Sequence, residues 1–272
     1  MNMRSLVAIS GASILAFSLS ACGGSSDDKG DAAGLDLVSS GTLTVCSDVP
    51  YPPFEDFDTA AASGFSGFDI DIVQAVADGL DLKLAVKDSS FDGLQSGLSL
   101  NAGECDVAAS AMTITEDRAK SIAFSDGYYD SKQSLLVSAD GGISSIADLD
   151  GKNVGVQQGT TGESYAKENA KGAKLIAFPS NAEMFQAMKA GQVDALLQDL
   201  PVNVDNAKVD GSFKVAEEYS TDETYGLAMK KGNTALVEAV NKELTALRDG
   251  GDYQLLYDKY FTAGDDAAST SR

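Results

Sequence analysis

Apolar positions along the chain follow two periods, one typical of helices and one typical of strands. In the segment after Gly67, the apolar residues that fall on one helical face are Ile72, Val73, Val76, Ala77 and Leu80. The next segment, 82–87, alternates apolar and lysine side chains and predicts a strand. With strands at 43–45 and 107–109 and a second helix at 91–101, the order predicts a parallel, doubly wound α/β sheet.

A second α/β series follows a strand at 134–138. Its predicted strands are 153–156, 175–178 and 193–197, and its helices are 163–169 and a segment starting after Ser180. A strand at 225–229 and helices at 235–248 and 253–261 close the chain, and a polar tail follows at 262–272.

Composition narrows the classes of function. The 272 residues are enough for two domains, and a formal net charge of −21 argues against a nucleic-acid partner. Because the chain has no His, a Ser-His dyad is excluded and the commonest metal ligand is missing. Its three Cys form no CxxC pair, so the spacing predicts neither a zinc cluster nor a disulfide framework. No metal site or cofactor is expected.

The N-terminal residues 1–21 have the features of a signal peptide. Arg4 supplies the positive start, and the apolar run 6–19 is short for a membrane span. Leu19-Ser20-Ala21-Cys22 resembles a bacterial lipoprotein box, in which the Cys receives fatty-acyl chains such as palmitate and becomes the mature N-terminus. The alternative is an ordinary signal peptide. Residues 22–38 would form a flexible tether that holds the protein outside the cytoplasm on the cell membrane.

The stretch 106–118 predicts an anion site. A short apolar strand enters a turn rich in hydroxyl groups, and a helix is expected just after it, with Thr115 as N-cap and Arg118 in its first turn. The alternative is an ordinary strand-to-helix connection with Arg118 in solvent. The Gly/Thr turn 157–162 offers a second helix N-terminus of the same kind.

Cys46 and Cys105 fall on two strands that we expect to be neighbours. Cys46 lies near the end of its strand and Cys105 at the start of the other, so parallel register would hold them too far apart to bond. The expectation is therefore two buried thiols.

Several short motifs, taken together and in order, resemble the extracellular substrate-binding proteins of polar-amino-acid ABC importers, the bacterial solute-binding protein family 3. They are Tyr51-Pro52-Pro53-Phe54-Glu55, Gly67-Phe68-Asp69-Ile70-Asp71, Phe91-Asp92-Gly93-Leu94, Met112-Thr113-Ile114-Thr115 with Arg118, Phe124-Ser125-Asp126, Gly159-Thr160-Thr161, Val193-Asp194-Ala195 with Asp199, and Tyr225-Gly226. The resemblance implies a two-lobed α/β fold of the type II periplasmic-binding-protein class. Each lobe is then a mostly parallel sheet flanked by helices, and two hinge strands join the lobes. Lobe 1 is expected at 39–129 and 225–261, and lobe 2 at 130–224.

The resemblance also implies roles for single residues. Arg118 and Thr113 would hold the ligand carboxylate, together with the backbone N–H of Thr161, and Asp199 would bind the α-ammonium group. An amino-acid zwitterion needs one cationic and one anionic anchor, and here they would come from opposite lobes.

Four more residues complete the implied ligand contacts. Ser110 and Ala111 would supply backbone contacts, while the rings of Tyr51 and Phe91 would enclose the ligand's stem. Ala111 and Gly162 stand where some relatives carry larger or more polar residues, which leaves side-chain specificity open.

Asp48 and Gln157 are expected to face the ligand's side chain. A poorly solvated carboxylate at Asp48 would favour arginine, lysine, histidine or glutamine and disfavour glutamate and aspartate. The alternative is that Asp48 faces solvent or caps a backbone N–H in the loop that contains Pro52 and Pro53.

The function implied is capture of a free amino acid by a monomer, which delivers it to the transmembrane subunits of an ABC permease. Two alternatives are a periplasmic dehydratase-like enzyme on the same fold and a sensor lobe that binds without transport. No pair of carboxylates with an evident acid/base division is visible, so we expect no enzyme.

Overall fold

The structure, a computed structural model, describes residues 34–262. The signal peptide, Cys22, most of the tether and the tail from residue 263 lie outside the described residues. Among residues 34–262, no helix combines the length and the apolar character needed to cross a bilayer.

The first lobe contains a five-stranded sheet in the order β4-β1-β5-β12-β6. Its strands are β1 (Thr42–Ser47), β4 (Lys83–Asp88), β5 (Val107–Ala108), β6 (Ile122–Phe124) and β12 (Ala228–Lys230). Its helices are α1 (Phe68–Gly79), α2 (Phe91–Gln95), α3 (Leu98–Asn101), α7 (Thr234–Asp249) and α8 (Asp252–Phe261). Strands β2 (Asp56–Phe57) and β3 (Phe65–Ser66) pair with each other in a small separate hairpin. The chain therefore returns to the first lobe after completing the second.

The second lobe contains a five-stranded sheet in the order β11-β7-β10-β8-β9. Its strands are β7 (Tyr129–Ser138), β8 (Asn153–Gln157), β9 (Lys174–Phe178), β10 (Ala195–Asp199) and β11 (Phe213–Tyr225). Its helices are α4 (Thr161–Asn169), α5 (Asn181–Lys189) and α6 (Leu200–Val209). Both sheets are mixed, because β12, β6, β7 and β11 run antiparallel to their neighbours while the remaining pairs are parallel.

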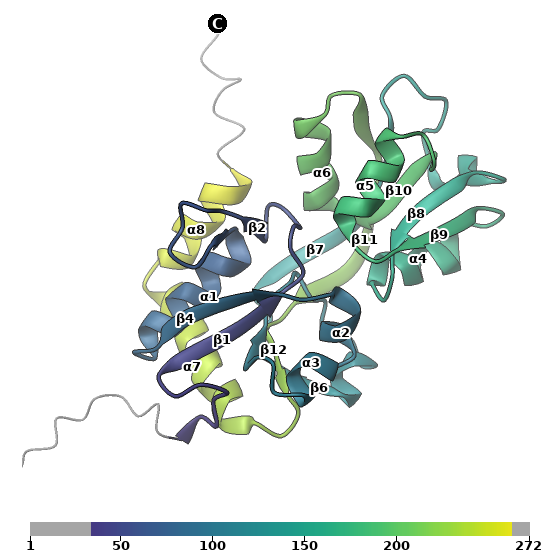
Figure 1. The fold of residues 1–272 in the computed structure, drawn as a ribbon. Helices are drawn as coiled ribbons and strands as arrows, with labels where there is room; N and C mark the ends of the chain where they lie inside the picture. The colour runs from purple at the N-terminus through teal and green to yellow at the C-terminus, as the bar shows by residue number, and fades with distance from the viewer. Residues whose placement is uncertain (1–33, 263–272) are drawn as a thin grey trace, which may run out of the picture.

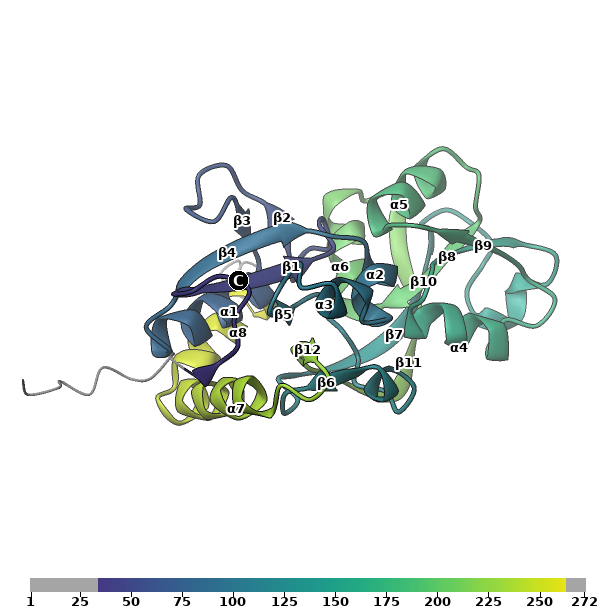
Figure 2. The same cartoon turned by 60° about the horizontal axis from the view of Figure 1, so that its bottom comes forward.

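Two long strands connect the lobes, as Figures 1 and 2 show. Strands β7 and β11 pair antiparallel along most of their length, and Tyr225 lies opposite Tyr129 where they meet the first lobe. Apolar clusters lie in both lobes, and one cluster of the first lobe also includes Val202 of α6. This is the two-lobed type II α/β fold that the sequence motifs implied.

Three predicted elements differ from the structure. The predicted helix 91–101 is divided into α2 and α3, because Gly97 adopts a φ of +79° between them. The helix expected after Thr115 is only a 3-10 turn at Arg118–Lys120. The predicted strand 225–229 is split between the end of β11 and β12, which belong to different sheets.

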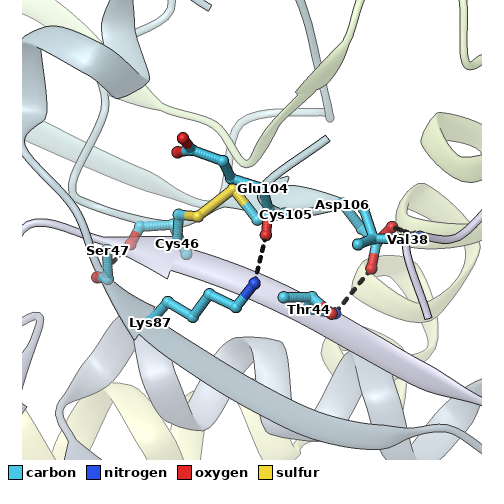
Figure 3. The surroundings of a disulfide bond; sticks show 9 residues. Val38, Thr44, Cys46, Ser47, Lys87, Glu104, Cys105 and Asp106 are labelled. Atoms are coloured by element: carbon cyan, nitrogen blue, oxygen red, sulfur yellow. Dashed lines mark hydrogen bonds between the residues drawn. A yellow bond between two sulfur atoms is a disulfide. The ribbon is translucent and has the colours of Figure 1, made fainter. Parts of the chain in front are cut away.

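The prediction that Cys46 and Cys105 are free thiols is wrong, since they form a disulfide with their Cα atoms 5.8 Å apart. Figure 3 shows the bond and the residues around it. Cys46 pairs in register with Ala108, but Cys105 precedes β5 and lies in the turn that leads from α3, where the strand register does not apply. That turn carries Cys105 back over Cys46, and Lys87 Nζ donates to the Glu104 carbonyl beside it at 2.7 Å.

Candidate functional site

A small cavity lies between the two lobes. All ten residues predicted to bind the ligand line it. From the first lobe come Asp48, Tyr51, Phe91, Ser110, Ala111, Thr113 and Arg118. From the second lobe come Gln157, Thr160, Thr161 and Asp199. Of these, only Thr160 had no predicted role, although it lies within the predicted Gly/Thr turn.

Arg118 supplies the positive charge of the cavity. Its side chain is buried rather than in solvent, and its guanidinium donates to the Thr113 carbonyl at 2.8 Å and to the Gly159 carbonyl of the other lobe at 3.0 Å. The guanidinium carbon lies 5.1 Å from the centroid of the Phe91 ring. Burial lowers the pKa of Arg118 to about 10, so the group stays charged at neutral pH.

The turn before Arg118 is held by a hydroxyl group. Thr115 Oγ1 accepts from the Arg118 backbone N–H at 3.2 Å, which is the contact expected of the predicted N-cap. The helix itself ends after one 3-10 turn, so the guanidinium is positioned by the carbonyls it contacts rather than by a long helix.

The N-terminus of α4 faces the same cavity from the second lobe. Thr160 is its N-cap, and its hydroxyl accepts from the Glu163 N–H at 3.0 Å. Thr161 is the first helical residue, so its N–H belongs to the group at a helix start that has no intrahelical acceptor. These N–H groups and the helix dipole favour an anion at this end of the cavity.

Asp199 lies at the end of β10 and is 7% exposed. It accepts from the Tyr51 hydroxyl at 2.8 Å and from Gln133 Nε2 at 2.5 Å. Burial and, to a smaller extent, the neighbouring charge of Glu223 raise the pKa of Asp199 to about 6, although the bonds from Tyr51 and Gln133 oppose the rise. A cation placed at this carboxylate would find it already desolvated.

Asp48 follows the end of β1 and faces the cavity, so the alternative of a solvent-facing or loop-capping carboxylate does not hold. Its Oδ2 accepts from Gln157 Nε2 of the other lobe at 2.6 Å, and its own N–H donates to Ser110 Oγ at 3.1 Å. Burial raises the pKa of Asp48 to about 6; the charge of Asp88 adds to the rise and the bond from Gln157 opposes it.

Two buried carboxyl groups lie behind Ser110 and Ala111. Ser110 Oγ donates to Glu55 Oε1 at 2.6 Å, and the Ala111 N–H donates to Asp69 Oδ2 at 2.7 Å. The second bond holds Ala111 at a φ of +43°, a left-handed conformation that L-residues other than Asn and Asp seldom adopt. Glu55 of the YPPFE motif and Asp69 of the GFDID motif thus support the cavity wall without lining the cavity.

Two hinge residues escaped the prediction. Gln133 on β7 and Glu223 on β11 are both buried and bonded to predicted site residues. Both residues lie on the two strands that join the lobes, but neither strand has a periodic pattern that singles out these two side chains.

Comparisons with known proteins give one consistent result. The sequence-family model of the bacterial extracellular solute-binding proteins, family 3, matches residues 43–263. A probable histidine-binding protein of Neisseria gonorrhoeae is 33% identical, over 96% of this chain and 97% of its own. The lysine/arginine/ornithine-binding periplasmic protein of Escherichia coli is 35% identical, over 81% of this chain and 87% of its own. Among solved structures, an ancestral arginine-binding protein bound to glutamine superposes with a TM-score of 0.77 at 38% identity, over 82% of this chain and 99% of that one.

Proposed function

The chain belongs to family 3 of the bacterial extracellular solute-binding proteins, and we propose that it captures a basic or amide amino acid for an ABC permease. The observation that carries this proposal is the cavity itself, where a buried cation and a buried anion, Arg118 and Asp199, face the same small space from opposite lobes. The histidine, lysine, arginine and ornithine named for two relatives belong to the same class of ligand.

We infer that the α-carboxylate binds at Arg118 and at the start of α4, where the Thr161 N–H is available. Thr113 would hold the α-carboxylate together with Arg118. The α-ammonium group would bind Asp199, and Ser110 and Ala111 would supply backbone contacts. Arg118 already spans the cleft through the Gly159 carbonyl, so the ligand carboxylate would meet an oriented guanidinium.

The ligand's side chain would extend towards Asp48 and Gln157, between the rings of Tyr51 and Phe91. Since Asp48 is desolvated and the side chain that bonds to it, Gln157, is a neutral amide, arginine, lysine, histidine and glutamine can supply the donors it needs. Glutamate and aspartate would place a second negative charge beside it and bind poorly.

Lobe closure follows from a ligand that touches both lobes, because only the closed form makes both sets of contacts. The boundaries proposed are 39–129 with 225–261 for lobe 1 and 130–224 for lobe 2. The support for them is that the antiparallel strands β7 and β11 cross between the two sheets at these positions.

Membrane attachment through Cys22 is also part of the proposal, as are a monomeric state and the absence of enzymatic activity. The support for attachment is the Leu19-Ser20-Ala21-Cys22 sequence followed by a polar tether. Acyl chains on Cys22 would keep the binding protein beside the permease, since a net charge of −21 gives no attraction to anionic lipid.

The test is a thermal-shift screen of the twenty amino acids followed by titration calorimetry on wild type and Arg118→Ala. A ligand at 100 times its Kd adds about 2.7 kcal/mol to the free energy of unfolding. Removing one partner of a buried charge pair costs about 2–5 kcal/mol, so Arg118→Ala should weaken binding roughly 30- to several-thousand-fold.

The control is Arg248→Ala, which removes an exposed arginine of α7 that does not line the cavity and should leave affinity unchanged. If Arg118→Ala binds the ligand with wild-type affinity, Arg118 does not hold the ligand carboxylate. A wild type that binds none of the basic or amide amino acids would refute the proposed function.

A further inference from the structure

Glu223, on the hinge strand β11, accepts hydrogen bonds from both lobes at once. Its Oε2 accepts from Thr113 Oγ1 of the first lobe and from Thr161 Oγ1 of the second, each at 2.7 Å. Its Oε1 accepts from Gln133 Nε2 on the other hinge strand at 3.1 Å. Three donors converge on one carboxylate that is 7% exposed and does not line the cavity.

The backbone of β11 directs Glu223 inward. The pairing of β11 with β7 shifts register between Tyr219 and Glu223, and Asp222 takes a φ of +51° in that irregularity. A bulge of this kind re-aims the following side chain and is a built feature of a strand. Asp222 itself stays exposed, so two adjacent acidic residues have opposite environments.

We propose that Glu223 is a positioning residue for ligand retention, a carboxylate that completes its hydrogen bonds only when the lobes close. Thr113 moves with the first lobe and Thr161 with the second, and their hydroxyl oxygens lie 3.5 Å apart in this closed arrangement. When the lobes separate, Glu223 can keep at most one of these two donors. The closed form therefore gains a charge-assisted hydrogen bond that does not depend on the ligand's side chain.

Glu223 also connects closure to the two proposed anchors. Thr113 offers its carbonyl to Arg118, while Gln133 donates to both Asp199 and Glu223. Each threonine hydroxyl has a single O–H donor, and that donor is used in the hydrogen bond to Glu223. The orientation of both hydroxyl groups at the cavity wall is therefore fixed. The carboxylate thus orders groups of both lobes without touching the ligand.

Glu223→Gln is the informative substitution because an amide has one acceptor and one donor group. If its oxygen faces the two threonines, its NH2 group faces the NH2 group of Gln133, and two donors oppose each other. If the amide turns round, the threonine hydroxyls lose their acceptor. Either orientation breaks part of the network while volume is kept.

This inference rests on the proposed function for its main readout, the release of tritiated L-arginine from the purified full chain. Glu223→Gln should raise the release rate and Kd about 10- to 100-fold, with the association rate within about threefold of wild type. The same factor should apply to lysine and glutamine, because Glu223 does not contact the side chain. Asp222→Asn is the matched control: it removes the adjacent charge at an exposed position whose φ asparagine tolerates, and it should match wild type.

A double-mutant cycle separates this role from general destabilisation. Thr161→Val removes one hydroxyl donor and keeps the shape of the side chain. It should raise the release rate in wild type and have a much smaller effect in Glu223→Gln, because the hydroxyl acts through Glu223. Additive effects, or a release rate in Glu223→Gln within twofold of wild type, would overturn the proposal.

A second measurement keeps this proposal apart from the proposed function. If the wild type binds no arginine, lysine, histidine or glutamine, the proposed function fails. The role of Glu223 in lobe closure is then tested by small-angle scattering of the ligand-free proteins. A larger radius of gyration in Glu223→Gln than in wild type and Asp222→Asn would support the role in closure. Equal radii would overturn it.

Discussion

Asp69→Asn should make the protein more stable above neutral pH, although it removes a fully buried carboxyl group. Asp69 Oδ2 accepts from the Ala111 N–H and from the Tyr128 hydroxyl, both at 2.7 Å. Asp69 Oδ1 and Glu55 Oε2, both buried, have no hydrogen-bond partner within the part of the chain that the structure describes. Burial raises the pKa of Asp69 from 3.8 to about 7, and it raises the pKa of Glu55 with a further contribution from the charge of Asp69.

The sign of the pH effect follows from this raised pKa. The folded chain keeps the Asp69 proton up to about pH 7, whereas the unfolded chain releases it near pH 3.8. The stability from this group is therefore fully present below about pH 3.8 and is lost as the pH rises through 7. At about 1.36 kcal/mol for each unit of pKa, the loss amounts to at most about 4 kcal/mol.

Asparagine would preserve the useful contacts. Its oxygen can accept from Ala111 and Tyr128, and its NH2 group can then donate to the unpartnered oxygen of Glu55. We expect the free energy of unfolding of Asp69→Asn to exceed that of wild type by about 2–4 kcal/mol at pH 8 and to match it near pH 4.

The assay is urea unfolding followed by circular dichroism at half-unit steps from pH 4 to pH 8. Asp78→Asn is the control, because it makes the same change at an exposed position of α1 and should reproduce the wild-type profile. A variant that is less stable than wild type at pH 8, or that keeps the wild-type dependence on pH, would refute the reasoning.

Three further predictions use other parts of the chain. In a competition series, Asp48→Asn should weaken basic ligands about 10- to 100-fold and glutamine less, and preferred binding of glutamate or leucine by wild type would contradict the assignment. Replacing Cys46 and Cys105 together with alanine should cost about 4 kcal/mol in urea unfolding, because the disulfide closes a loop of 59 residues; an unchanged midpoint would rule this out. Cys22→Ser should release the protein from the membrane fraction without altering its ligand affinity, and continued sedimentation with membranes would disprove lipid attachment.

Local periodicity was enough to predict most elements of the fold. The apolar face of α1 was predicted from spacing alone, and Ile72, Val73, Val76 and Ala77 are all buried. The α/β alternation fixed the class because strands and helices of this length leave few other ways to cover both faces of a sheet. The ten predicted cavity residues came from the family resemblance, and spacing alone would have given only the two anion-binding turns.

What escaped prediction depends on contacts between distant segments. The disulfide forms because the turn before β5 leaves the strand register, and no local pattern around Cys105 encodes the path of that turn. Gln133 and Glu223 lie 90 positions apart and meet only because the hinge strands pair. The same limit applies to the segment after Thr115, where local signals for a helix were present but the chain turns directly into β6.

The closed cleft has a consistent pattern of pairing around its carboxylates. Asp48 accepts from the amide of Gln157, and Asp199 accepts from the amide of Gln133. A neutral amide satisfies a buried oxygen without cancelling its charge, so burial still raises the pKa of both carboxyl groups to about 6. Keeping a buried carboxylate charged costs free energy, and the side chains of Gln157 and Gln133 only lessen that cost. A ligand ammonium or guanidinium group would remove it. We therefore expect the site to discriminate by charge, because a ligand with a second cationic group would gain at Asp48 what every amino acid would gain at Asp199.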